Sequence, residues 1–237
     1  MTIRRLSFAV CALALLLPSA PAFAGFVIDN FSTNVPELEV GGVNGSTHST
    51  SLTGLGDTSG TRDITVTGSS TASITGGLVS LTFGGGPASV VFKYTFDTLG
   101  GIDLHSAGLS RFLQVPFFVD FTTGSANRDI RLDVNYKSLT TSTNRNFAER
   151  HMTAVNNGMQ VYDGTLLGDG ALASSVSELT ITMTKVAGSG TADNNNGGGN
   201  QILQAVPEPG SMLLAGISSL GALGMAFLRK RSKKQSA

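Results

Sequence analysis

The chain has 237 residues, and sixteen Lys and Arg balance sixteen Asp and Glu, so the formal net charge is zero. The charge is uneven along the chain: residues 25–206 hold nine cations against fifteen carboxylates, a net charge of about −6, and positive charge gathers at the two ends. An acidic body without a basic patch excludes nucleic acid as a partner, because phosphate binding needs clustered Lys or Arg.

The first 24 residues have the three parts of a secretory signal peptide. Arg4 and Arg5 precede an apolar stretch at 6–17, and Ala22-Phe23-Ala24 is an A-x-A cleavage site. The sequence therefore predicts export, with cleavage after Ala24. The apolar stretch is short for a membrane-spanning helix. Cys11, the only cysteine, lies in this leader, so we expect the mature chain to have neither disulfides nor thiolate metal sites.

Residues 25–205, the predicted ectodomain, show the two-residue periodicity of half-buried strands. Alternation is clearest in three segments, each of which turns one apolar face to a core: 90–96, 130–136 and 179–183. Further predicted strands cover 26–31, 62–67, 72–75, 78–83, 112–121 and 201–204. Strands at this spacing, with turn-forming residues between them, predict an all-β fold, a β-sandwich of jelly-roll type.

Several segments interrupt this pattern. Pro116 predicts a bulge or a sheet edge within 112–121, since proline cannot donate to the ladder. The stretches 39–60 and 188–200 are rich in Gly, Ser, Thr and Asn, and we expect them to be surface loops that bury little apolar surface. The segment 193–197 (DNNNG) has oxygen ligands spaced as for calcium, but its single carboxylate favours a turn.

A tentative ligand face is predicted around Arg131 and Asp133, which share one face of their strand. A polar ladder of this kind can hydrogen-bond sugar hydroxyls, and a simple solvated sheet face has the same pattern. Tyr162 is included in this tentative face as the best candidate for an exposed aromatic ring, although a core ring with its hydroxyl at the rim is the favoured interpretation. Arg62 and Asp63 are either part of a ligand groove or a charged strand end that protects an edge.

The sequence lacks the motifs that would identify an enzyme. His48, His105 and His151 are far apart and lack metal-ligand spacing, and no G-x-S-x-G nucleophile motif occurs. Carboxylates are plentiful, but nothing selects a pair of the kind that a glycosidase needs. We therefore expect a non-enzymatic protein that uses neither a metal nor a cofactor.

Residues 206–237 have three consecutive parts: Pro207-Glu208-Pro209, an uncharged apolar stretch at 211–228, and a basic tail at 229–234. A helix of eighteen residues spans about 27 Å, close to the hydrocarbon thickness of a bilayer. The prolines prevent this predicted transmembrane helix from extending backwards. The positive-inside rule then predicts a cytoplasmic basic tail and an exported body.

This order of motif, helix and basic tail resembles the PEP-CTERM sorting signal of Gram-negative bacterial envelope proteins. The resemblance covers 206–237 only. It implies that an exosortase in the inner membrane recognises Pro207-Glu208-Pro209, removes the helix and tail, and passes the body to the surface. It also implies a host that makes exopolysaccharide. A permanent C-terminal anchor is the alternative.

Together these features predict an exported protein that is membrane-anchored with a cytoplasmic C-terminus before processing, and at the cell surface or extracellular after it. We expect a structural or adhesive role in an exopolysaccharide or biofilm matrix. A carbohydrate-binding module with a site at Arg131 and Asp133 is the first alternative, and a secreted polysaccharide-active enzyme is the second.

Overall fold

A computed structural model describes the part of the chain that carries the predicted strands. The described residues are 26–97, 101–106, 109–121, 129–139, 144–146, 149–153, 159–163, 175–195 and 201–207. Residues 25–208 form one compact unit. The predicted signal peptide, the apolar stretch 211–228 and the basic tail lie outside the described residues. In the portion that is described, no helix has the length and apolar character needed to cross a membrane.

Fifteen antiparallel strands account for the regular structure of the described residues. They are β1 (Phe26–Asp29), β2 (Val35–Glu39), β3 (Thr47–Ser51), β4 (Gly60–Thr75), β5 (Leu78–Phe96), β6 (His105–Ser106), β7 (Leu109–Val115), β8 (Phe118–Phe121), β9 (Asp129–Ser138), β10 (Asn144–Asn146), β11 (Arg150–Met152), β12 (Gln160–Asp163), β13 (Val176–Ala187), β14 (Gly190–Asp193) and β15 (Leu203–Pro207).

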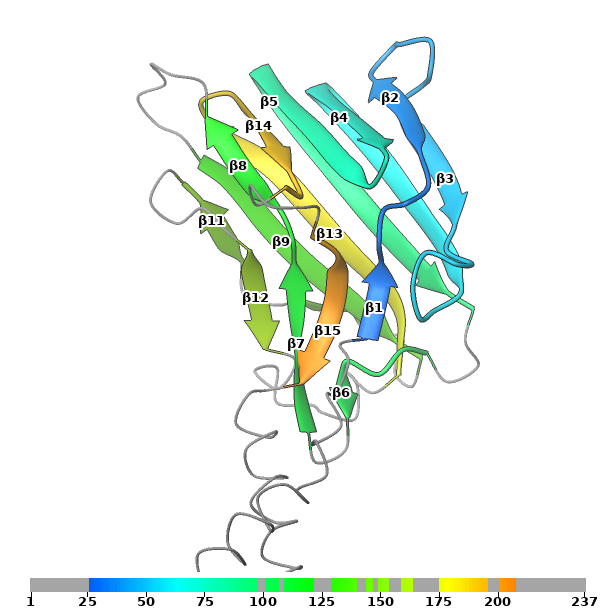
Figure 1. Cartoon of the computed structure of the whole chain (residues 1–237). Coiled ribbons are helices and arrows are strands. Elements are labelled where there is room, and N and C mark those ends of the chain that lie inside the picture. Colours follow the sequence, from blue (N-terminus) through cyan, green and yellow to red (C-terminus); the bar gives the residue numbers. More distant parts are fainter. Residues whose placement is uncertain are drawn as a thin grey trace, which may run out of the picture. The chain divides into compact units, whose positions relative to one another are not determined.

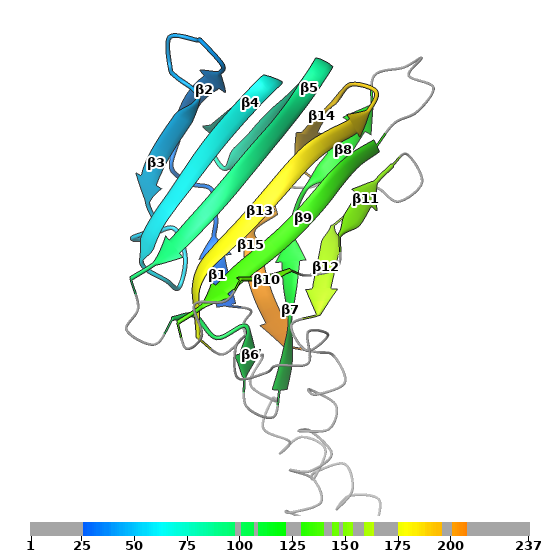
Figure 2. The same ribbon diagram turned by 180° about the vertical axis from the view of Figure 1, so that it is seen from behind.

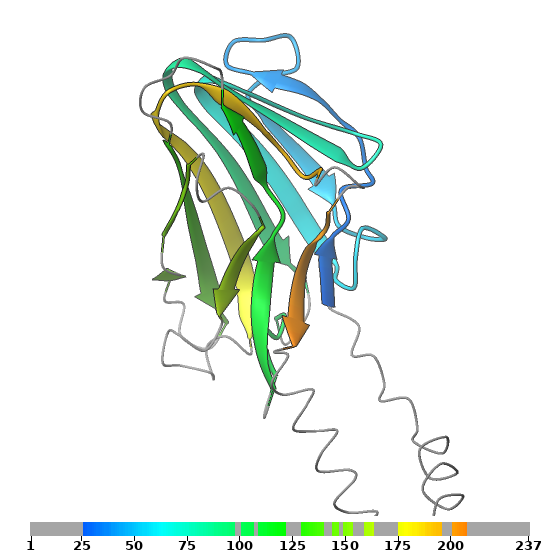
Figure 3. The same cartoon turned by 60° about the vertical axis from the view of Figure 1, so that its left-hand side comes forward.

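The strands form two sheets that pack face to face (Figure 1). The smaller sheet has the order β1-β15-β7-β12, with β6 also paired to β7, and the larger sheet contains the other ten strands. Figure 3 shows the two layers from the side. The predicted all-β sandwich is therefore confirmed, while its jelly-roll connectivity stays a prediction.

The larger sheet is built on the long hairpin of β4 and β5. β4 pairs with β5 along its length, and β2 and β3 pair with the other side of β4. Beyond β5 the ladder continues through β13 to β9, whose far edge pairs with β10 and β11. Figure 2 shows β4, β5, β13 and β9 side by side on the outer face.

The alternation in the three clearest predicted segments is confirmed. Every apolar side chain at the alternate positions of 90–96, 130–136 and 179–183 is buried, with at most 6% of its surface exposed. Between the sheets, the rings of Phe31, Phe92 and Phe117 lie with centroids 5.2 to 6.4 Å apart. These rings join the segment after β1 and the β7–β8 crossover to β5 of the larger sheet.

Two loop predictions are wrong in part. β3 lies within 39–60, and Leu52 and Leu55, which follow it, are buried in the core. β14 lies within 188–200 and pairs with β5 and β8. Both strands are short and polar, so hydrophobic periodicity does not reveal them. Backbone pairing with neighbouring strands holds them in place instead.

Pro116 marks a crossover between the sheets. β7 ends at Val115 in the smaller sheet, and β8 begins at Phe118 in the larger one. Pro116 and Phe117 between them are buried. The predicted strand 112–121 is therefore two strands, broken where proline cannot donate a ladder hydrogen bond.

Candidate functional site

The outer face of the larger sheet is polar. Along β9 the residues between the buried apolar ones turn outward, and those of β13 lie beside them. The register places Asp133 opposite Thr182 and Asn135 opposite Thr180. The Cβ atoms of residues directly opposite each other on neighbouring strands lie within about 5.5 Å. Hydroxyl, amide and charged groups therefore stand in adjacent rows.

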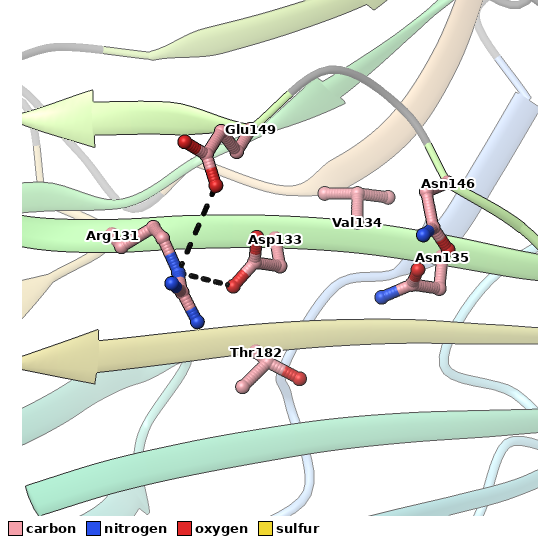
Figure 4. A pocket seen from close by; sticks show the side chains of 7 residues that line it. All are labelled: Arg131, Asp133, Val134, Asn135, Asn146, Glu149 and Thr182. Carbon is pink, nitrogen blue, oxygen red and sulfur yellow. Dashed lines mark hydrogen bonds and ion pairs between the residues drawn. The ribbon is translucent and has the colours of Figure 1, made fainter.

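A hollow of about 370 Å³ opens on this face at β9 (Figure 4). Its walls come from β9, β13, β10 and the residue before β11: Arg131, Asp133, Val134, Asn135, Asn146, Glu149 and Thr182. The predicted pair Arg131 and Asp133 thus lies together in a concave surface. Asn146 and Glu149 were missed, because β10 and β11 are three residues long and carry no periodic signal.

An ion pair organises the centre of the hollow. Arg131 Nε donates to Asp133 Oδ2 at 2.8 Å and lies 4.0 Å from Glu149 Oε2. The Arg131 side chain is 42% exposed, so the pair contributes little to stability. Its effect is to orient the guanidinium beside the hydroxyl and amide groups of the wall.

His151 extends the charged cluster at the edge of the sheet. It stands opposite Arg131 in the ladder, with Nδ1 2.8 Å from Asp129 Oδ2 and Nε2 3.3 Å from Glu149 Oε1. Hydrogen bonding to Asp129, and then to Glu149, raises the pKa of His151 above its ordinary value. Glu149 therefore contacts both His151 and Arg131.

A second hollow, of about 220 Å³, adjoins the first and shares Asn135 with it. Its other lining residues are Tyr136, Lys137, Glu178 and Thr180. Glu178 forms an ion pair with Lys93 of β5 at 2.9 Å. The two hollows follow the same pair of strands.

Tyr162 does not belong to this face. It lies on β12 of the smaller sheet with its ring 1% exposed, and its hydroxyl donates to the Leu132 carbonyl oxygen at 3.4 Å. The Arg150 guanidinium lies 5.5 Å from the ring centroid. Burial raises the pKa of the Tyr162 hydroxyl well above its usual range. The ring fills the space between the sheets, as the favoured core alternative predicts, so Tyr162 is not part of the tentative ligand face.

Arg62 is neither in a groove nor at an exposed strand end. It is fully buried between the sheets, with Nη1 2.7 Å from Asp29 Oδ2. Asp29 also accepts hydrogen bonds from the Phe31 amide and the Tyr94 hydroxyl. Burial raises the pKa of Asp29, although the Arg62 guanidinium and these hydrogen bonds oppose the change. Asp63 points outward and accepts a hydrogen bond from Ser49.

The polar segment that begins at Asp193 has a structural role. The Asn194 side chain is buried, accepts from the Val79 amide, and donates to the Gly77 and Gln201 carbonyl oxygens. These contacts tie the residue after β14 to the β4–β5 turn and to the segment before β15. Within the described part of the chain, no group of three or more His, Cys, Asp or Glu is arranged to hold a metal ion.

One comparison concerns the end of β15 and the tail beyond it. Residues 205–231 match the PEP-CTERM protein-sorting motif. The chain carries a PEP-CTERM sorting signal. The match includes the predicted Pro207-Glu208-Pro209, the apolar stretch and the start of the basic tail. A search of curated proteins finds no match to this sequence.

Solved structures similar to this PEP-CTERM protein include carbohydrate-binding modules. A family 28 module specific for non-crystalline cellulose is 11% identical, with a TM-score of 0.36, and the alignment covers 61% of this chain and 79% of that one. A mutant family 29 module is 10% identical over 67% and 85% of the two chains, with a TM-score of 0.32. A module of promiscuous specificity from the β-sandwich superfamily is 11% identical over 79% and 63%, with a TM-score of 0.34. At these scores the likeness establishes neither a shared topology nor a shared ligand.

Proposed function

We propose that this protein is exported and sorted by an exosortase to the cell surface or the extracellular matrix. The PEP-CTERM motif at 205–231 is the observation that carries the proposal. A signal peptide at 1–24 is cleaved after Ala24, and the helix at 211–228 holds the precursor in the inner membrane with its basic tail in the cytoplasm. The exosortase then recognises Pro207-Glu208-Pro209 and removes the tail.

The proposed role of the exported body is structural or adhesive, within an exopolysaccharide or biofilm matrix, and it is not enzymatic. The polar outer face of the larger sheet supports this role, because its hydroxyl and amide groups suit contact with a polyhydroxylated polymer. The acidic body, with a net charge of about −6, keeps the protein soluble outside the cell.

The intact mass of the protein from the cell surface and the medium tests the sorting step. We expect a wild-type product that lacks the apolar stretch and the basic tail, and a Glu208→Ala variant that stays uncut in the membrane. Glu37→Ala, on an exposed position of β2, is the matched control and should be processed normally. If wild type and Glu208→Ala both keep 211–237, the tail is a permanent anchor and the proposal fails.

A carbohydrate-binding module is the second candidate function. It is favoured by the hollow at Arg131, which is lined by a guanidinium, two carboxylates and two amides. On a glycan array, selective binding that Arg131→Ala abolishes would identify a defined sugar site. Binding that is broad and unaffected by Arg131→Ala would instead support the adhesive role alone.

A further inference from the structure

The two hollows of the larger sheet form one strip. They share Asn135, and both lie along β9 and β13. The residues Arg131 and Lys137 lie at its opposite ends, six positions apart on the same face of β9. At about 3.4 Å per residue the strip is about 20 Å long. A ligand that fills both hollows must therefore be extended and run parallel to the strands.

Uncharged hydrogen-bonding groups occupy the middle of the strip. Asn135 stands opposite Thr180, and Thr182 lies two residues further along β13. The Asn135 amide and the two threonine hydroxyls can each donate and accept hydrogen bonds. Such groups match the hydroxyls of a sugar chain. Asn135 lines both hollows and so lies at the junction of the two subsites.

The charged groups that line the strip do not favour an acidic ligand. Three carboxylates line it against two cations: Asp133, Glu149 and Glu178 against Arg131 and Lys137. Ion pairs already join Arg131 to Asp133 and Glu178 to Lys93. An anionic polymer would have to displace these carboxylates and approach an acidic body, whereas an uncharged polymer meets no such repulsion.

We propose that this strip binds a neutral polysaccharide as an extended chain, which lies along β9 and β13 and occupies both hollows at once. The inference rests on the proposed contact with exopolysaccharide. It adds the charge class of the polymer, the direction of the chain and two adjoining subsites that meet at Asn135.

Calorimetric titration of the protein with neutral oligosaccharides, from disaccharide to hexasaccharide, tests the strip. Affinity should rise with length until the ligand spans both hollows and should change little with salt, because hydrogen bonds to an uncharged ligand are weakly screened. Asn135→Ala should weaken hexasaccharide binding about tenfold, the equivalent of one or two hydrogen bonds.

Two threonine variants separate the subsites. Thr182→Ala removes a hydroxyl from the first hollow and Thr180→Ala removes one from the second. Each should weaken binding of the hexasaccharide, whereas a disaccharide, which fills one hollow, should respond to one of them only. Thr65→Ala is the matched control and should bind as wild type. Thr65 is on β4 and lies on the same outer face of the larger sheet, but outside both hollows.

The outcomes distinguish this inference from the proposed function. Equal affinity for disaccharide and hexasaccharide would overturn the extended site, and tighter, salt-dependent binding of a uronate polymer would overturn the neutral charge class. Either result leaves the proposed matrix role standing. Binding to no neutral or acidic polysaccharide would overturn both the strip and the matrix contact, while the mass experiment tests sorting separately.

Discussion

Asp29 and Arg62 form an ion pair that is fully enclosed between the two sheets. Removing one partner leaves the other charge buried without compensation, which typically costs about 3–5 kcal/mol. We expect Arg62→Met to lower the free energy of unfolding by about this amount in urea denaturation. The Phe31 amide and the Tyr94 hydroxyl still donate hydrogen bonds to the remaining carboxylate, but they carry no positive charge to compensate it.

The double variant Asp29→Asn/Arg62→Met is the control for this prediction. It removes both charges and keeps an acceptor for the Phe31 amide, which Asp29 Oδ1 provides in the wild type. We expect it to recover most of the lost stability, since apolar replacement of a buried ion pair is often neutral. A double variant as unstable as Arg62→Met would mean that packing, and not charge, sets the cost.

His151 gives the charged end of the strip a pH dependence. Its pKa is raised above 6.5, chiefly by Asp129. Because the folded value exceeds the unfolded one, protonated His151 contributes stability that is fully present below about pH 6.5 and is lost as the pH rises through the raised value. Asp129→Asn should lower the pKa of His151 in an NMR titration of the imidazole.

The matched control for this titration is Asp63→Asn. Asp63 lies on the same face, but β5, β13 and β9 separate it from β11. The His151 titration should therefore be unchanged in this variant. If Asp129→Asn also leaves it unchanged, the hydrogen bond between Asp129 and His151 does not set the pKa.

At the scale of elements, the β4–β5 hairpin changes register at one place. The shift lies between Gly68 and Ser70, and the buried Ser70 hydroxyl fills it, 2.7 Å from the carbonyl oxygens of Thr67 and Ser89. On the far side of β5 the partner changes here, from β14 at 80–83 to β13 at 89–95. The register shift therefore coincides with the place where β5 changes its outer partner from β14 to β13.

Gly68 is required at this shift for two reasons. Its φ of 66° is in the left-handed region, and a Cβ there would overlap the Pro87 carbonyl oxygen. Gly76, at the hairpin turn, has a similar φ of 59° but open space around it. In urea denaturation, Gly76→Ala should lower the free energy of unfolding by about 1–2 kcal/mol, from backbone strain alone. Gly68→Ala should lower it by distinctly more. Equal costs would show that the backbone relieves the overlap.

At the scale of the molecule, two-residue periodicity predicts the strands that bury one apolar face, but not how they pair. Alternation along a strand places Arg131 and Asp133 on one face, because they are two residues apart. The same rule predicts that Arg62 points into the core, because it is two and four residues from the buried Ile64 and Val66. Strand pairing, and not local sequence, brings Asn146 and Glu149 to the site. A local pattern of apolar and polar residues contains no information about these pairings. The four residues of β12 show no clear period, so the local pattern leaves both a core and an exposed position open for Tyr162.

The sorting signal and the fold overlap at β15. This strand lies inside the smaller sheet, paired to β1 on one side and β7 on the other, and Leu203 and Ala205 are buried. Its last residue, Pro207, is also the first residue of Pro207-Glu208-Pro209. A cut before Leu203 would remove the strand that connects β1 to its sheet. Processing that keeps the whole of β15 must therefore occur after Pro207.

Truncation tests this limit on the cleavage point. A chain of residues 25–208 keeps β15 and should unfold in one cooperative urea transition, whereas a chain of residues 25–202 should lose that transition. The loss of two buried side chains and of both ladders is large against the roughly 5–15 kcal/mol by which domains are stable. Circular dichroism measures the transitions, and the mass of the surface product should place its C-terminus beyond Pro207. A stable 25–202 chain would show that the smaller sheet does not need β15, and cleavage before the motif would then be compatible with a folded body.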